Sequence, residues 1–174
     1  DPSGEPFPSV EATSLAGEAV KIPEDFAGAP VLLLVGYVQG TQFDIDRWLY
    51  GAIDAELEIA LREVPAARGA AASLAKGFID SGMQRGIPRD EWGAVTTTYG
   101  DAAEAIGRFT GTERPRNARV LLLDSNGMVR WFYDQGYSAM KLKALEAAVK
   151  DVAAPAPDAD ADADANIDAD TDAE

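Results

Sequence analysis

The six residues from Tyr37 to Gln42 connect a predicted strand to a predicted helix, and we call this segment the crossing. It lies where α/β proteins often carry reactive groups. It leaves an apolar strand, VLLLVG, and leads into a helix that begins near Thr41. Ligands of α/β proteins bind at the carboxyl ends of such strands. The crossing reads YVQGTQ and contains no Cys, His, Lys or Ser. It therefore offers only backbone N–H groups, the side-chain amides of Gln39 and Gln42, and the phenol of Tyr37.

The composition excludes most of the chemistry expected at such a position. The 174 residues contain neither cysteine nor histidine. Without a thiolate there is no thiol–disulfide exchange, no disulfide and no thiolate metal site. Without imidazole the commonest general base and metal ligand is missing. We therefore expect no cofactor and no metal, exclude a thiol oxidoreductase or peroxidase, and consider an enzyme of any other kind less favoured than a binding protein.

Carboxylates are the remaining groups that could act in catalysis. Asp44, Asp46 and Asp54 share one helical region, where a solvated helix face explains them. An alternative function remains open, in which a thiol-independent enzyme binds a small molecule or an anion in the same cleft. Asp44 or Tyr37 would be the polar group of that enzyme.

The helix start after the crossing has two interpretations. Free backbone N–H groups at a helix N-terminus attract anions. Asp44 and Asp46 would repel an anion there, so the sequence favours a structural role. In that interpretation Thr41 caps the helix and Asp44 completes a capping box.

Three arginines crowd the loop before the strand RVLLLD. Arg114, Arg116 and Arg119 could bind an acidic segment, because guanidinium groups pair with carboxylates bidentately. The simpler interpretation is solvated charges that pair with the acidic helix or with Glu113.

The elements that must position these residues follow from hydrophobic spacing. PVLLLVGY lacks alternation and predicts a strand covered on both faces. Apolar residues at helical spacing, Ile53 among them, predict a helix from Thr41 that Pro65 ends. Leu74, Phe78 and Met83 are the apolar anchors of the next helix. The further predicted elements are a hairpin strand over 19–22, one loosely packed helix over 70–84, a strand in WGAVTTTYG, a helix over 101–111 with Asp101 and Glu104 as a capping box, a strand pair over 119–133 that turns at 125–127, and a closing helix over 138–152 capped by Ser138.

Two long segments resemble the thioredoxin-like superfamily. EPFPSVEATSLAGEAVKIPEDFAGAPVLLLVGY resembles the opening of thioredoxin-like and peroxiredoxin-like domains, and RVLLLDSNGMVRWFYDQGYSAMKLKAL resembles their closing hairpin and helix. The resemblance covers nearly all of residues 5–150. It implies an α/β fold with a mixed central sheet, helices on both faces, an N-terminal β extension and a helical insert.

The same resemblance shows what this chain lacks. Laid on the redox pattern, Gly40 and Phe43 stand where the two cysteines would be, and Ala118 stands where redox members carry a cis-proline. The segment VLLLDSNGMVRW is most similar to the thioredoxin-like mitochondrial ATP-synthase assembly-factor family. That similarity implies a non-redox role in membrane-complex assembly, and it rests on Leu122, Asp124, Gly127, Arg130 and Trp131.

These observations predict a redox-inactive thioredoxin-like domain that acts by binding a protein or peptide, as a folding or membrane-complex assembly accessory. A purely structural domain is a third possibility. The net charge of −15 argues against nucleic acid, no apolar run is long enough to span a membrane, and the oligomeric state stays open. The candidate binding residues are Tyr37, Gln39, Gly40, Thr41, Gln42, Phe43, Arg116 and Asn117.

Composition divides the chain into three parts. Residues 1–9 read as an extended lead-in, residues 10–152 as the thioredoxin-like domain, and residues 153–174 as an acidic, Asp/Ala-rich, disordered tail. Residues 155–174 carry eight of the net negative charges, which leaves −7 for the first 154 residues. Alternating Asp residues could bind Ca²⁺ weakly, but the glycine and glutamate of an EF-hand loop are missing. The start at Asp1 and the extended lead-in favour an exported, periplasmic protein.

Overall fold

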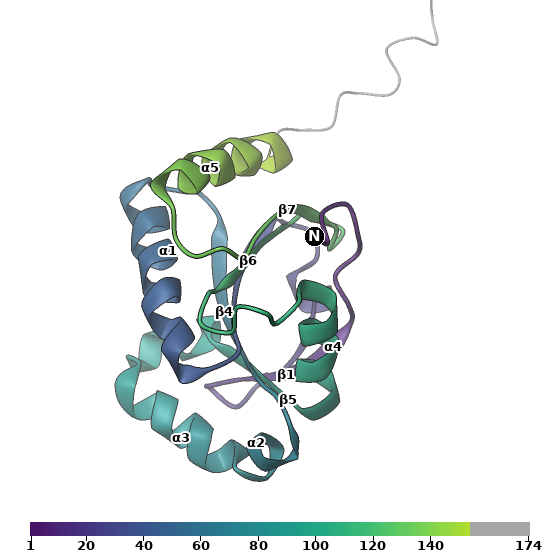
Figure 1. The fold of residues 1–174 in the computed structure, drawn as a ribbon, viewed down its shortest axis with the longest axis vertical. Helices are drawn as coiled ribbons and strands as arrows, with labels where there is room; N and C mark the ends of the chain where they lie inside the picture. Colours follow the sequence, from purple (N-terminus) through teal and green to yellow (C-terminus); the bar gives the residue numbers. More distant parts are fainter. Residues whose placement is uncertain (154–174) are drawn as a thin grey trace, which may run out of the picture.

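A seven-stranded mixed sheet forms the middle of the protein. The computed structural model describes residues 1–153 (Figure 1). The strand order is β2-β1-β5-β4-β3-β6-β7. β4 runs parallel to both β3 and β5, whereas β6 runs antiparallel to β3 and β7. The strands are β1 (Val10–Ser14), β2 (Ala19–Ile22), β3 (Val31–Gly36), β4 (Ala60–Ala67), β5 (Thr96–Tyr99), β6 (Arg119–Leu123) and β7 (Val129–Tyr133).

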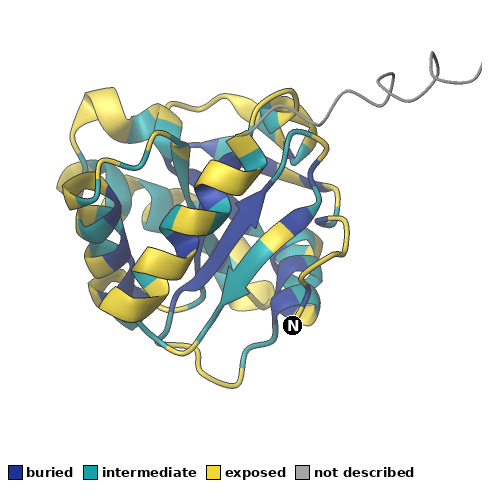
Figure 2. Cartoon of the chain, turned by 90° about the horizontal axis from the view of Figure 1, so that it is seen from above, coloured by how far each residue is buried: buried dark blue, intermediate teal, exposed yellow. Residues whose placement is uncertain are grey.

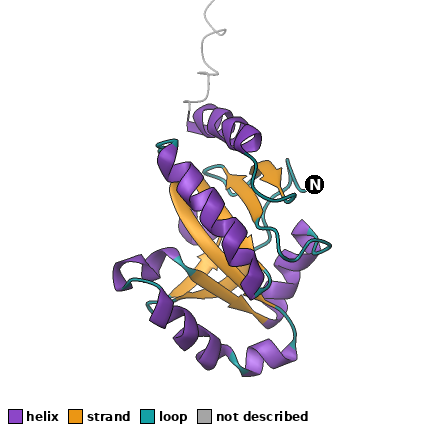
Figure 3. Ribbon diagram, turned by 60° about the vertical axis from the view of Figure 1, so that its left-hand side comes forward, coloured by secondary structure: helices purple, strands orange, loops and turns teal. Residues whose placement is uncertain are grey.

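Helices cover both faces of this sheet (Figure 3). α4 packs on one face, and α1 and α5 pack on the other. This arrangement, with its N-terminal β1–β2 hairpin and a helical insert, confirms the predicted fold class. The helices are η1 (Glu24–Phe26), η2 (Gln39–Thr41), α1 (Gln42–Asp54), α2 (Ala70–Leu74), α3 (Lys76–Gly86), η3 (Arg89–Ala94), α4 (Gly100–Thr110) and α5 (Ala139–Ala153).

β3 is covered on both faces, as its unbroken apolar run predicts. All six of its residues are buried (Figure 2). Its odd-numbered residues pack in one core cluster with Ile106 of α4. Leu32 and Leu34 pack in a second cluster with Trp48 of α1 and Leu145 of α5. Each fully buried aliphatic side chain contributes about 1.5–3 kcal/mol, so β3 anchors both halves of the core.

The long helix predicted to reach Pro65 is wrong in its second half. α1 ends at Asp54, and Glu56 turns the chain with a φ of 49°. β4 then lies between β3 and β5, with Val64 and Ala66 buried on alternate positions. The sheet decides this outcome, because hydrogen bonds from two neighbouring strands satisfy the β4 backbone.

The insert after β4 also departs from expectation. The single helix predicted over 70–84 is two helices, α2 and α3, with a break at Ala75. Leu74 and Phe78, predicted as apolar anchors, are 91% and 77% exposed. A hydrogen bond of 2.6 Å from Tyr99 Oη to Asp80 Oδ1 attaches α3 to the end of β5 instead.

The end of α4 and the start of α5 match the predicted boundary signals. Gly111, with a φ of 71°, follows the last residue of α4. Ser138 Oγ accepts a hydrogen bond of 3.4 Å from the backbone N–H of Lys141 and caps α5. The capping box predicted from Asp101 and Glu104 does not form, because α4 begins one residue earlier and Tyr99 occupies the cap position.

The predicted acidic tail lies outside the described residues, apart from Ala153, which ends α5. Within residues 1–153, none of the helices has the length and apolar character required to cross a bilayer. The division into lead-in, domain and tail stays a prediction.

Candidate functional site

Thr41 attaches the crossing to the loop before β6. Its hydroxyl Oγ1 donates a hydrogen bond of 2.8 Å to the carbonyl oxygen of Pro115 and accepts one of 3.3 Å from the N–H of Val38. The side chain of Thr41 is buried and makes no cap bond to α1, so the predicted capping role is wrong. Thr41 instead joins two segments that are 74 residues apart.

Asp44 binds two further backbone groups across the same edge of the sheet. Its Oδ2 accepts a hydrogen bond of 2.8 Å from the N–H of Ala118, and its Oδ1 accepts one of 2.7 Å from the N–H of Tyr137. Only 9% of Asp44 is exposed. The capping box with Thr41 is therefore absent, and this carboxylate joins the first turn of α1 to the segments that lead into β6 and α5. Nothing in the local sequence identifies these partners.

Arg119 is buried rather than solvated. Its Nε donates to the carbonyl of Gly111 at 3.0 Å, and its Nη1 donates to the carbonyls of Asn117, at 2.9 Å, and Arg114. The guanidinium lies 5.2 Å from the centre of the Tyr37 ring. Among the described residues its Nη2 has no hydrogen-bond partner. This cation therefore shapes the 111–117 loop and stabilises the carboxyl end of α4, and it is not a surface ligand group.

Tyr37 points into the protein and not to the surface of the crossing. Its hydroxyl hydrogen-bonds the hydroxyl of Thr110. Burial raises the pKa of the Tyr37 phenol, against smaller opposing effects of that hydrogen bond and of Arg119. The predicted rim residue Tyr37 is thus part of the wall beneath the site.

The exposed part of the crossing is apolar at two positions. Val38 is 45% exposed and Phe43 is 78% exposed, with Gln39 also at the surface. Gly40 faces Arg116, whose Cγ would lie 3.7 Å from a Cβ placed on the glycine. Val38 was not among the predicted site residues. An apolar residue in the polar segment between strand and helix could have indicated an exposed contact residue.

The remaining predicted site residues lie around this apolar part. Arg116 is exposed, whereas Asn117 is half-buried. The Nδ2 of Asn117 donates a hydrogen bond of 3.0 Å to the carbonyl oxygen of Asp134. The arginines were expected to pair with the acidic helix or with Glu113. Arg114 pairs instead with Asp134, at 3.9 Å between Nη1 and Oδ1. Arg116 makes no ion pair within residues 1–153 and is available to a partner.

Gln42 connects the crossing to β4. Its Nε2 donates to Asp46 Oδ1 at 2.9 Å and to Glu63 Oε2 at 3.5 Å. Burial raises the pKa of Glu63, and the negative charge of Asp46 adds to that effect, while the hydrogen bond from Gln42 opposes it. The edge of the site next to β4 is therefore acidic.

The arrangement provides binding groups and no reactive group. Gln39, Val38, Phe43 and Arg116 are exposed in the crossing or next to it, and we call these four residues the crossing surface. In the part of the chain that the structure describes, no cluster of three acidic side chains is placed to hold a metal ion. The crossing surface can contact apolar side chains and pair with a carboxylate.

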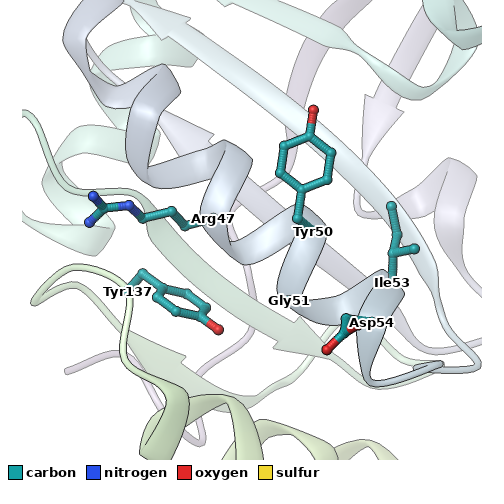
Figure 4. A pocket seen from close by; sticks show the side chains of 6 residues that line it. All are labelled: Arg47, Tyr50, Gly51, Ile53, Asp54 and Tyr137. Atoms are coloured by element: carbon teal, nitrogen blue, oxygen red, sulfur yellow. The ribbon is translucent and has the colours of Figure 1, made fainter.

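A separate hollow of about 580 Å³ lies farther along α1 (Figure 4). Gly51 lies close to Tyr137, because a Cβ on Gly51 would come to 3.0 Å from the Tyr137 side chain, and a larger residue would have to displace it. Ile53, predicted to face the core, is 60% exposed. The lining residues are Arg47, Tyr50, Gly51, Ile53, Asp54 and Tyr137.

No protein-family model matches the chain, and no curated protein matches its sequence. Solved structures do match. BsSco, a member of the Sco family of cytochrome c oxidase assembly proteins, is 14% identical with a TM-score of 0.59, over 87% of this chain and 95% of that one. A SCO1/SenC family lipoprotein from Bacillus anthracis is 13% identical with a TM-score of 0.58, over 86% of this chain and 95% of that one.

A third match is a protein from Chlorobium tepidum described as a putative thiol:disulfide interchange protein DsbE. It is 18% identical with a TM-score of 0.55, over 86% of this chain and 96% of that one. Each match spans nearly the whole of the similar structure, at an identity that shows the fold alone. These likenesses and the sheet order establish that this chain has the thioredoxin-like fold.

Proposed function

We propose that this chain is a redox-inactive thioredoxin-like domain that binds a protein or peptide partner, as an accessory to folding or to membrane-complex assembly. One observation carries the proposal. Thr41 and Asp44 fix the crossing to the main chain of neighbouring segments, while Val38 and Phe43 remain exposed at the position where redox members act.

The crossing surface favours a protein partner. Val38 and Phe43 offer apolar contact, and Arg116 adds a cation beside Gly40, which lies between them in the sequence. An apolar centre with a charged rim is the usual composition of a protein interface. A partner segment with an apolar residue next to a carboxylate would complement this surface. Because the crossing is already held in place, binding costs little ordering entropy.

The comparisons support the assembly role and export without deciding either. The Sco family is described as cytochrome c oxidase assembly proteins, and another similar structure is a lipoprotein. The resemblance of VLLLDSNGMVRW to ATP-synthase assembly factors points in the same direction. A location outside the cytoplasm and a membrane-complex client are therefore parts of the proposal.

The enzyme alternative is weakened by the two groups it requires. Both carboxylate oxygens of Asp44 accept backbone hydrogen bonds, and the Tyr37 hydroxyl pairs with Thr110. Neither group faces the surface where a substrate would bind. Binding explains the arrangement better than catalysis.

The test uses two phenylalanines of equal exposure. Phe43 and Phe78 are 78% and 77% exposed, but only Phe43 belongs to the crossing surface. A photo-crosslinking residue at Gln39 is introduced into the wild-type chain, into Phe43→Asp and into Phe78→Asp. Each is expressed in the native organism, and crosslinked products are identified by mass spectrometry.

We expect a reproducible partner with the wild-type chain and with Phe78→Asp, and its loss with Phe43→Asp. Circular dichroism and thermal melting check that both variants remain folded. Equal crosslinking by both variants, or loss with both, would count against the crossing surface. Arg116→Glu supplies an independent check, because a partner with a carboxylate should then be lost as well.

A further inference from the structure

The outer side of α1 presents exposed side chains without partners inside the protein. Tyr50 and Ile53 are 68% and 60% exposed. Arg47 and Asp54 are also exposed, and neither takes part in an ion pair or side-chain hydrogen bond within residues 1–153. We call these four residues the α1 outer face. Exposed apolar side chains with a polar border are typical of an interaction surface.

The two charges of this face cannot satisfy each other. Arg47 and Asp54 are seven residues apart, which is close to two helical turns and about 10 Å along the axis. With 3.6 residues per turn, all four side chains lie within about 120° around the helix, and Figure 4 shows Arg47 and Asp54 at the border of this face toward Tyr137. One cation and one anion are thus held apart at the two ends of one row.

We propose that the α1 outer face pairs with the same face of a second copy of this chain. The midpoint between Arg47 and Asp54 falls at Tyr50 and Gly51. A twofold axis at that midpoint, with the two α1 helices antiparallel, places Arg47 of each copy opposite Asp54 of the other. Both ion pairs form together, which is the self-complementarity that a twofold interface requires. Tyr50 then lies beside the axis and meets its own counterpart.

The charge pattern favours a second copy over other occupants. An acidic segment, including the residues after Ala153, would complement a face of positive charge only. The α1 outer face carries one positive and one negative side chain, so a single-sign partner gains one contact and meets one repulsion. A second copy gains two attractions, one at each end of the row.

The expected association is weak. Standard interfaces bury about 800 Å² on each partner. α1, with 13 residues, is only about 20 Å long. The net charge of −15 on each copy also opposes association, although salt near 0.15 M screens charges beyond about 8 Å. We therefore expect a dimer with a dissociation constant in the micromolar range or weaker. This inference does not rest on the proposed function, since none of its four residues belongs to the crossing surface.

Sedimentation velocity of the full chain, from micromolar to near-millimolar concentration, tests the proposal through charge reversal. In the dimer of Arg47→Asp, each of the two contacts between positions 47 and 54 joins two anions. In the dimer of Asp54→Arg, each of these contacts joins two cations. We expect each variant to weaken dimerisation by tenfold or more. An equimolar mixture of the two variants should associate again, because every contact is then between opposite charges. The double variant should also recover dimerisation.

Arg85→Asp makes the same charge change on α3 and serves as the control. Tyr50→Ala should weaken dimerisation without changing secondary structure by circular dichroism. A wild-type chain that is monomeric over the whole concentration range would overturn the proposal. So would a dimer that Arg47→Asp and Asp54→Arg leave unchanged, or a mixture of these two variants that stays monomeric.

Discussion

The carboxylate of Asp44 and the backbone N–H of Ala118 form a buried hydrogen bond of 2.8 Å between residues 74 positions apart. The other oxygen of Asp44 binds the N–H of Tyr137. One side chain thus connects the start of α1 with the segments before β6 and α5. The site is held together by this connection and by the bond from Thr41 to Pro115.

Asp44→Ala should lower the free energy of unfolding by about 3 kcal/mol, because it leaves the N–H of Ala118 buried and unpaired and removes a charged acceptor from Tyr137. Asp44→Asn retains one acceptor oxygen and should lose about half as much. Urea denaturation followed by tryptophan fluorescence measures both. A loss below about 1 kcal/mol for Asp44→Ala would mean that these bonds contribute little.

Substitutions of Arg119 test whether the shape of this buried cation contributes more to stability than its charge does. Arg119→Met leaves the carbonyls of Gly111 and Asn117 without their donor and should destabilise the protein by about 2 kcal/mol. Arg119→Lys keeps the charge but lacks the planar fork that reaches several carbonyls at once, so it should recover little. Thermal melting compares the three proteins. Wild-type stability of Arg119→Lys would show that charge alone is sufficient.

Glu63 makes stability depend on pH in a defined direction. Burial raises its pKa above the ordinary 4.5, so the folded state holds this proton more tightly than the unfolded state does. Stability from this group is therefore present at low pH and is lost as pH rises through the raised pKa. Glu63→Gln should be more stable than wild type at pH 7, and the difference should disappear near pH 4.

The control for that measurement is Glu91→Gln, at an exposed position. Urea denaturation at several pH values compares both variants with wild type. A stability gain for Glu63→Gln that is the same at pH 4 and pH 7 would exclude titration of Glu63 as its cause.

A thiol placed in the crossing would report the electrostatics of the site. The chain has no cysteine, so Gly40→Cys carries a single thiol. Arg116 lies beside this position, with its Nε 3.9 Å from the Cβ that the substitution adds. The guanidinium and the helix start should lower the pKa of the introduced thiol below its ordinary value of about 8.5.

Gly77→Cys on α3 is the matched control, because nothing lies within 4 Å of a Cβ there. The rate of alkylation by iodoacetamide as a function of pH gives both pKa values. Equal pKa values for the two thiols would contradict the effect expected of Arg116 and the helix start.

Most of the fold follows from local patterns, and the exceptions have physical causes. The unbroken apolar run of β3, the Gly127 turn between β6 and β7, and the Ser138 cap of α5 are visible in the sequence because each depends on neighbouring residues. β4 was missed because Leu61 and Val64 continue the helical spacing of α1. Only the pairing of β4 with β3 and β5 shows that this segment is a strand.

The candidate site was predictable in its location and not in its connections. The crossing follows β3 as expected, and Gln39, Phe43 and Arg116 are exposed. The role of Asp44 depends on backbone groups 74 and 93 residues away, and that of Arg119 depends on how the 111–117 loop folds back on it, which no spacing rule reveals. Both residues were therefore interpreted as surface charges, although each is buried.

The bond between Asp44 and Ala118 also constrains how this site can change. Its donor is a main-chain N–H, so most residues could replace Ala118 without losing it. Proline cannot, because it has no N–H. In the resemblance to the redox pattern, Ala118 is the residue expected where redox members carry a cis-proline. Ala118→Pro would therefore leave Asp44 Oδ2 without its donor, and a proline at this position would require a compensating substitution at Asp44.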